Sequence, residues 1–145
     1  MKAILVAGGH GSRLLPMTNY THKTLLPLCG KPIIDYALAT IRNCGIKEIT
    51  IIGNRFIDKI RKHVGDEVRY VLEESPQGVA AALQLAREGN EETPLMIWFS
   101  DNITNLNLRS EVRDFTTGAV LLTREVQNPE DFGVAVVENN KIVDV

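Results

Sequence analysis

A glycine-rich loop with two nearby cations offers the residue types that bind phosphate. Three glycines fall within four residues, at Gly8, Gly9 and Gly11. Glycine has no Cβ and tolerates positive φ, so a ligand can approach the backbone closely there. Arg13 and Lys23 follow a few residues later. Backbone N–H groups combined with positive charge suit a polyphosphate.

Two known phosphate-binding patterns fail at this loop. A dinucleotide-binding fingerprint needs a third glycine where Leu14 stands, at the close contact between helix and strand. A P-loop needs a glycine before its Lys-Thr pair, and His22 stands there. On the three glycines alone, a turn with solvated charges stays open as an alternative.

A carboxylate that could hold a metal follows a later apolar run. Ser100-Asp101-Asn102 comes directly after the segment 95–99. In open α/β sheets, ligands bind at the carboxyl ends of strands. Asp101 could hold Mg²⁺ there, because this hard cation prefers carboxylates, waters and phosphate oxygens. The alternative is an Asx-turn that only caps the strand.

The elements that must position these groups alternate between strand and helix. Short apolar runs predict buried strands, and apolar residues spaced by three and four, ended by Gly or Pro, predict helices. We expect strands at residues 2–6, 48–52, 68–72 and 95–99, and helices at 32–44, 56–64 and 77–88, the last closed by Gly89. The strand at 95–99 is too apolar to have a solvent-exposed face. This pattern predicts an α/β fold whose parallel sheet is covered on both sides.

The pattern loosens after residue 100. We expect a short helix at 107–115, a strand at 119–123 and a hairpin of 133–138 with 141–145 that turns at Asn139-Asn140. A terminal strand of this kind leaves an unpaired edge, so a homo-oligomer is a further expectation.

Composition bounds the class of protein. A length of 145 residues with 44% hydrophobic content fits one globular domain. The net charge of −2 gives no general basic field for nucleic acid or for an anionic membrane. Cys29 and Cys44 lack metal-ligand spacing and are expected to be reduced thiols. With neither a leader nor an apolar run near ~18 residues, the chain is expected to be cytoplasmic.

The sequence around the glycine loop matches a longer pattern. It runs Gly8-Gly9-His10-Gly11-Ser12-Arg13-Leu14-Leu15-Pro16-Met17-Thr18, then Lys23-Thr24-Leu25-Leu26-Pro27 and Lys31-Pro32-Ile33-Ile34. On these residues the chain resembles the sugar-1-phosphate nucleotidyltransferases, and among them the glucose-1-phosphate thymidylyltransferases. The resemblance implies a Rossmann-like three-layer sandwich with a mostly parallel sheet, of the nucleotide-diphospho-sugar transferase type.

The resemblance also implies a reaction, its partners and its residues. A sugar-1-phosphate oxygen would attack the α-phosphorus of a nucleoside triphosphate, with dTTP and glucose-1-phosphate favoured. Arg13 and Lys23 would be catalytic, and Asp101 would bind Mg²⁺. The implied nucleotide contacts come from Ala7, Gly8, Gly9, Gly11, Ser12, Arg13, Glu73 and Gly78.

Two positions depart from the family pattern. Glu73 stands near the place of a glutamine that reads the pyrimidine edge in thymidylyltransferases, and Ser100 replaces a glycine. An ionised carboxylate only accepts hydrogen bonds, so it cannot copy both contacts of an amide. Transfer with UTP, GTP or CTP therefore stays open.

The resemblance covers only the nucleotide-binding part of the family. A second metal-binding aspartate and a lysine that grips the sugar phosphate lie beyond Val145 in the family pattern. Residues 1–145 are therefore expected to form a nucleotidyltransferase domain without the C-terminal part of the catalytic domain. A nucleotide-binding module without turnover of its own is the alternative.

Overall fold

The chain forms two compact units, Met1–Phe115 and Thr116–Val145. Its computed structural model describes residues 1–75, 77–87, 93–131, 133–139 and 141–144. Every residue proposed from the sequence for the site lies in the first unit.

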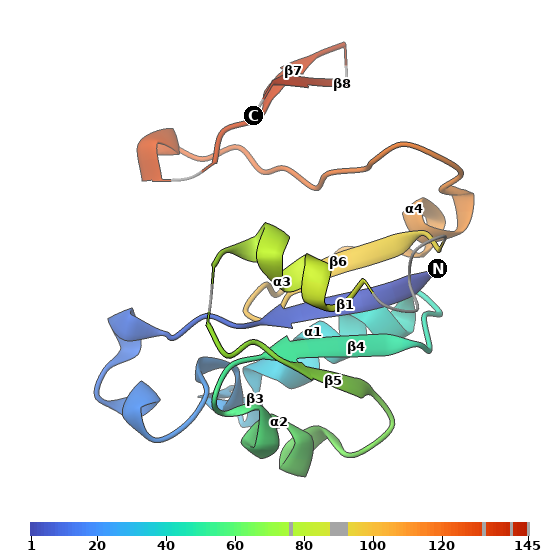
Figure 1. Ribbon diagram of the computed structural model, residues 1–145. Coiled ribbons are helices and arrows are strands. Elements are labelled where there is room, and N and C mark those ends of the chain that lie inside the picture. The colour runs from blue at the N-terminus through green and yellow to red at the C-terminus, as the bar shows by residue number, and fades with distance from the viewer. Residues whose placement is uncertain (76, 88–92, 132, 140, 145) are drawn as a thin grey trace. The chain divides into compact units, whose positions relative to one another are not determined.

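The first unit is built on a parallel sheet of four strands in the order β5-β4-β1-β6 (Figure 1). The strands are β1 (Lys2–Ala7), β4 (Ile49–Gly53), β5 (Arg69–Leu72) and β6 (Leu95–Phe99). Ala7 pairs with Gly53, and Val6 pairs with Phe99. Because the strands are parallel and their carboxyl ends lie almost level, the loops that follow them all leave from the same end of the sheet.

Helices cover both faces of this sheet (Figure 1). The helices α1 (Ile33–Asn43) and α2 (Ile57–Val64) pack on one face, and α3 (Val79–Leu85) packs on the other. Side chains alternate along β1, so Leu5 joins the core of α1 and α2 while Ile4 joins that of α3. The predicted α/β sandwich with a mostly parallel sheet is therefore confirmed.

The segment between β1 and α1 carries the glycine loop. It contains three 3₁₀ turns and a short antiparallel pair: η1 (Ser12–Leu14), η2 (Met17–Asn19), η3 (Lys23–Leu25), β2 (Pro27–Leu28) and β3 (Lys31–Pro32). Helix α1 begins directly after Pro32, as the fixed φ of proline favours. The apolar residues expected on its inner face, from Ile34 to Ile41, are buried.

Strand β6 corrects one expectation about burial. Its residues are apolar, yet Ile97 is 43% exposed and Phe99 is 39% exposed. The strand lies at the edge of the sheet, and the described part of the chain does not cover these two side chains. Apolar composition predicted a strand here but did not predict how many neighbours would surround it.

Element boundaries differ from the predictions by one or two residues at most ends, as is usual. Helix α3 is shorter than expected, since it starts at Val79 and ends at Leu85. Its predicted end at Glu88 and Gly89 lies outside the described residues. The last helix of the first unit, α4, spans Arg109–Asp114 within the predicted range.

The second unit contains a 3₁₀ turn, η4 (Pro129–Asp131), and the predicted hairpin. Strands β7 (Val136–Glu138) and β8 (Lys141–Asp144) pair in antiparallel fashion, with Asn139 at φ 49° in the turn. The other half of the predicted turn, Asn140, lies outside the described residues, as does Val145. The predicted strand at 119–123 is wrong, because these residues form no strand and Val120 and Leu121 are exposed. A short apolar run does not form a strand without a partner to pair with.

Both cysteines are free thiols, as expected, with Cys29 exposed and Cys44 buried. Among the described residues, no helix combines the length and the apolar character needed to cross a membrane.

Candidate active site

The fold brings together two residues that lie 78 positions apart in the sequence. Lys23 Nζ donates a hydrogen bond to Asp101 Oδ2 and forms an ion pair with it. The side chain of Lys23 is 24% exposed and that of Asp101 is 44% exposed, so the pair faces solvent. The alternative that the sequence left open, an Asx-turn that caps the strand, is not what holds this carboxylate, since its partner is the ammonium group of Lys23.

Ser100, the residue before Asp101, is buried, and its Oγ has no hydrogen-bond partner among the described residues. Ser100 N–H donates to the carbonyl oxygen of Val6 at 3.0 Å, which extends the pairing of β6 with β1. Positive φ occurs at other non-glycine residues but not at Ser100. The serine that replaces the family's glycine therefore leaves the position of Asp101 intact.

The glycine loop needs its glycines for space as well as for conformation. Gly11 has φ +66°, and a Cβ there would lie 2.9 Å from Thr18 Cγ2. A Cβ on Gly9 would lie 3.4 Å from Lys23 Nζ. One on Gly8 would lie 2.0 Å from Glu73 Oε2. The backbone of this loop therefore lies directly against Lys23 on one side and Glu73 on another.

Asn54 anchors the loop and was not proposed from the sequence. It follows β4 and is only 3% exposed. Its Nδ2 donates to the carbonyl oxygens of Gly8 at 3.2 Å and Gly9 at 3.3 Å, while Oδ1 accepts from Phe56 N–H at 3.0 Å. A polar residue at the carboxyl end of a buried strand was the signal that could have identified it.

His22 is a second buried polar residue next to the candidate site. It is 1% exposed, and both the hydroxyl and the N–H of Thr24 donate to its Nδ1, at 2.7 Å and 3.2 Å. Burial lowers the pKa of His22 from 6.5 to about 4, and the Lys23 ammonium adds to this effect. The ring is therefore neutral near pH 7, with its proton on Nε2.

Nε2 of His22 lies near the carbonyl oxygens of Ala7 and Gly9, which partly oppose the lowering of its pKa. It makes no well-formed hydrogen bond with any residue that the structure describes. His22 thus fixes the 3₁₀ turn that begins with Lys23 against the end of β1, a role that spacing alone did not reveal.

The remaining proposed residues occupy three different environments. Ala7 is buried at the end of β1, whereas Ser12 and Arg13 are exposed on η1. Glu73 follows β5 and is only 4% exposed, and Gly78 is exposed with φ +99° just before α3. The structure brings Lys23, Asp101 and Glu73 to the loop, while Arg13 reaches into solvent beside it.

A metal site built from protein groups alone is not present in the described part of the chain. No cluster of three or more His, Cys, Asp or Glu side chains occurs there. Asp101 offers one carboxylate, and that suits Mg²⁺ when waters and phosphate oxygens supply its other ligands. The arrangement fits an ion bound together with a phosphorylated substrate.

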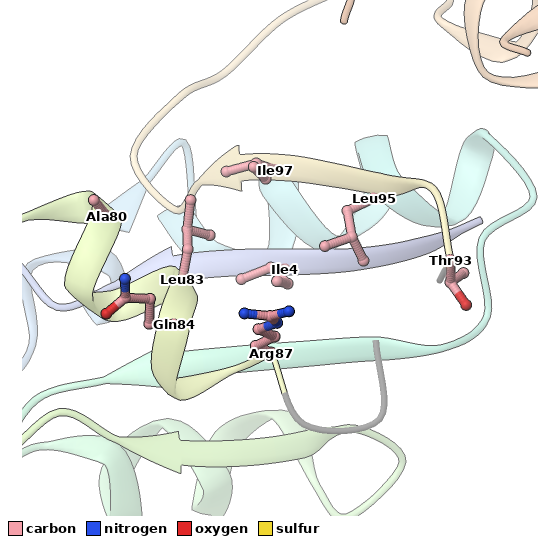
Figure 2. A pocket seen from close by; sticks show the side chains of 8 residues that line it. All are labelled: Ile4, Ala80, Leu83, Gln84, Arg87, Thr93, Leu95 and Ile97. Atoms are coloured by element: carbon pink, nitrogen blue, oxygen red, sulfur yellow. The ribbon is translucent and has the colours of Figure 1, made fainter. Parts of the chain in front are cut away.

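An open pocket of about 410 Å³ lies elsewhere in the first unit, between α3 and strands β1 and β6 (Figure 2). Ile4, Leu83, Leu95 and Ile97 make its lining largely apolar. None of the residues proposed for the site lines it. The chemically competent groups therefore gather at the glycine loop and not in this pocket.

The family comparison covers almost the whole chain. Residues 2–145 match the family model described as nucleotidyl transferase. The low-salt glycan biosynthesis nucleotidyltransferase Agl11 of Haloferax volcanii is 33% identical over 96% of this chain and 42% of its own length. A glucose-1-phosphate thymidylyltransferase of Streptomyces griseus is 32% identical over 97% of this chain and 42% of its own. The chain thus spans less than half the length of these relatives.

Solved structures give the same result for the fold. A Bacillus anthracis protein proposed to be a glucose-1-phosphate thymidylyltransferase, solved with a sucrose, has a TM-score of 0.93 and 33% identity. The match covers 99% of this chain and 63% of that one. A UDP-glucose pyrophosphorylase solved with UDP-glucose has a TM-score of 0.69 at 19% identity over 77% of this chain and 52% of its own, which supports the fold alone. Taken with the sequence match, these findings show that the chain belongs to the nucleotidyl transferase family.

Proposed function

We propose that the chain transfers a nucleotidyl group from a nucleoside triphosphate to a sugar-1-phosphate, with release of pyrophosphate. One observation carries the proposal. Lys23 forms an ion pair with Asp101 next to the glycine loop, and a Cβ on Gly9 would lie 3.4 Å from the Lys23 ammonium nitrogen. A cation, a carboxylate for a metal and exposed backbone are the groups that phosphate transfer needs, because positioning and charge stabilisation dominate this chemistry.

Each group has a distinct task in this proposal. The backbone at Gly8, Gly9 and Gly11 receives the triphosphate, and Lys23 holds a phosphate near the reacting phosphorus. Arg13, which is exposed beside the loop, folds onto the charge that grows on the leaving pyrophosphate. Asp101 would hold Mg²⁺ with phosphate oxygens, and the ion would neutralise charge on the transferring group.

Lys23 must change partners for this to happen. In the structure its ammonium group neutralises Asp101. When a triphosphate binds, Lys23 would pair with a phosphate and Asp101 would be able to hold the accompanying Mg²⁺, so both charges would remain paired. The ion pair is therefore a resting arrangement that keeps two site residues in place before substrate binds.

The names of the relatives support dTTP and glucose-1-phosphate as the first substrates to test. Both are phosphorylated metabolites, and we propose that the reaction takes place in the cytoplasm. Position 73 holds a carboxylate and not an amide, so the base does not follow from the relatives' names.

The test is pyrophosphate release by this chain with Mg²⁺, glucose-1-phosphate and each of dTTP, UTP, CTP, GTP and ATP. Release with one of them that depends on the sugar phosphate is the expected result. Lys23→Met should abolish this pyrophosphate release. Lys47→Met should not, because Lys47 precedes β4 and lies at the amino ends of the strands, opposite the glycine loop. Equal release from both variants would contradict the assigned site.

A nucleotide-binding module without turnover is the second candidate. The chain spans 42% of the length of each of the two relatives named above, so binding and turnover are tested separately. Triphosphate binding that Lys23→Met weakens, without pyrophosphate release from the folded chain, would support this candidate.

A further inference from the structure

Two buried polar atoms next to the Lys23–Asp101 pair have no hydrogen-bond partner among the described residues. They are Nε2 of His22 and Oγ of Ser100, and each of these residues is only 1% exposed. His22 directly precedes Lys23 in the chain, and Ser100 directly precedes Asp101. Native proteins almost always give a buried polar atom a partner, so a partner is expected for both atoms.

Both side chains lie at the carboxyl end of β1. The N–H of Ser100 donates to the carbonyl oxygen of Val6 at 3.0 Å, which places Ser100 opposite Ala7 in the parallel pairing of β6 with β1. On the other segment, Nε2 of His22 lies near the carbonyl oxygens of Ala7 and Gly9. Ala7 is therefore a neighbour of both residues.

The two side chains also lie on the same face of the sheet. Ser100 comes two residues after Trp98, and side chains two positions apart in an extended strand share a face. Trp98 and Ala7 belong to the core cluster on the side of α1. Leu25, which ends the 3₁₀ turn that His22 caps, packs against the same cluster. Nε2 and Oγ therefore face one small region of the interior, and they do not bond to each other directly.

We propose that His22 and Ser100 are positioning residues that hold one internal water molecule between them, and that this bridge keeps Lys23 and Asp101 in place when their ion pair opens. The inference rests on the proposed nucleotidyl transfer, in which both charges change partners. It assigns to the buried residues the task of holding the two segments together once a phosphate pairs with Lys23.

The donors and acceptors in this region suit a water molecule. Nδ1 of His22 accepts from the N–H of Thr24 at 3.2 Å, so the neutral ring carries its proton on Nε2. Nε2–H can donate to the water, and the water can donate to Ser100 Oγ and to the carbonyl oxygen of Ala7 or Gly9. A buried water typically makes about three such bonds. A cation would not suit this place, because Nε2–H is itself a donor.

The bridge supplies a restraint that the ion pair does not. The side chains of Lys23 and Asp101 are 24% and 44% exposed, so water and ions compete for their contact. The bonds between His22 and Ser100 are shielded from solvent and do not depend on either charge. The triphosphate and its cation therefore meet a lysine and a carboxylate that are already held at their separation, which lowers the cost of binding.

The first measurement is heteronuclear NMR of the substrate-free chain. The chain has three histidines, so the ring signal that disappears in His22→Asn belongs to His22. We expect a slowly exchanging Hε2 proton on this ring with a cross-peak to a long-lived water, and loss of that cross-peak in Ser100→Ala. Ser110→Ala is the matched control, because Ser110 is exposed on α4 and its hydroxyl donates to Glu111.

The second measurement is equilibrium binding of dTTP with Mg²⁺, or of whichever tested triphosphate binds most tightly. Ser100→Ala should weaken binding by about 2- to 10-fold, as expected for one lost hydrogen bond. His22→Asn should weaken it similarly, because asparagine keeps an acceptor for the N–H of Thr24 but lacks the distant donor. The double variant should bind no more weakly than either single variant, since both remove the same bridge.

His22→Gln separates the bridge from the turn. Its amide extends to about the place of Nε2 but offers no acceptor at the place of Nδ1, so it should bind the triphosphate more tightly than His22→Asn does. If His22 served only to hold its turn, the order of these two variants would be reversed, because only asparagine keeps the bond with Thr24.

Four results would overturn the inference while leaving nucleotidyl transfer in place. They are the lack of a water cross-peak at Hε2 of His22, a cross-peak that survives Ser100→Ala, losses of affinity that add in the double variant, and tighter binding by His22→Asn than by His22→Gln. If the folded, unmodified chain binds no triphosphate, the proposed function itself fails. The NMR measurement needs no nucleotide, so the two failures are distinguished.

Discussion

Replacing Gly11 with alanine tests whether the glycine loop is held by packing as well as by backbone conformation. Gly11 has φ +66°, where a residue with a Cβ costs about 1–2 kcal/mol. The added Cβ would lie 2.9 Å from Thr18 Cγ2 and 3.1 Å from Lys23 Cβ, so these side chains must move. Overpacking of this kind costs about 1–3 kcal/mol.

Thr18 cannot turn away without a further loss. It is 2% exposed, and its hydroxyl donates to the carbonyl oxygen of Gly11 at 2.8 Å. We therefore expect Gly11→Ala to lower the free energy of unfolding by about 2–5 kcal/mol. The displacement of Lys23 should also weaken triphosphate binding.

Gly45→Ala is the matched control. Gly45 has φ +83° after α1, and a Cβ there would meet nothing within 4 Å. Its replacement should therefore cost only the conformational part, about 1–2 kcal/mol. The difference between the two variants isolates the contacts with Thr18 and Lys23.

Urea unfolding followed by the fluorescence of Trp98, the single tryptophan, measures both variants. Trp98 is 7% exposed, so its emission reports on the core of the first unit. If the free energy of unfolding falls with urea at the same slope in both variants, the difference between their unfolding midpoints reports on stability alone. If the two alanine variants lose the same free energy and bind triphosphate equally well, the loop is not packed against Thr18 and Lys23.

Variants at four further positions probe the groups around the loop. Asp101→Asn should change the free energy of unfolding by less than about 1 kcal/mol, because its ion pair is partly exposed, yet lower pyrophosphate release about 100-fold. Arg13→Ala should lower kcat more than it raises the Kd for triphosphate, and equal losses would refute a role in the transition state. Asn54→Asp sets a carboxylate against two carbonyl oxygens and should cost about 2–3 kcal/mol in urea unfolding, with Asn54→Ala as the milder comparison. The pKa of His22 is about 4 in the folded chain and 6.5 in the unfolded chain. As the pH drops, the unfolded chain therefore takes up the proton first, and the free energy of unfolding should fall by about 3 kcal/mol between pH 6.5 and pH 4. His22→Asn should flatten this fall, and an unchanged pH profile would contradict the buried neutral ring.

Local sequence determined the elements that depend on near neighbours. The apolar run before Gly8 gives β1, and the spacing from Ile34 to Ile41 gives the inner face of α1. The glycines, Arg13 and Lys23 indicated the family, because their spacing lies within one continuous segment, and they also led to the proposed position of the site. These features need no knowledge of distant contacts, since helix periodicity and turn chemistry are set within a few residues.

Contacts between distant segments needed the tertiary structure. The sequence proposed Lys23 and Asp101 separately, but only the adjacency of β1 and β6 brings them into one ion pair. Asn54 and His22 carried no motif of their own, and their importance comes from the backbone carbonyls they face. The exposure of β6 and the missing strand at 119–123 likewise depend on partners that a linear pattern cannot supply.

Glu73 shows both contributions at once. The sequence determined that a carboxylate stands near the place where the resemblance to thymidylyltransferases implies a glutamine, and an ionised carboxylate only accepts hydrogen bonds. The tertiary structure decided that this residue is only 4% exposed and that its carboxylate lies against Gly8. Residue type determines which hydrogen bonds a side chain can make, whereas folding determines which partners lie close enough to make them.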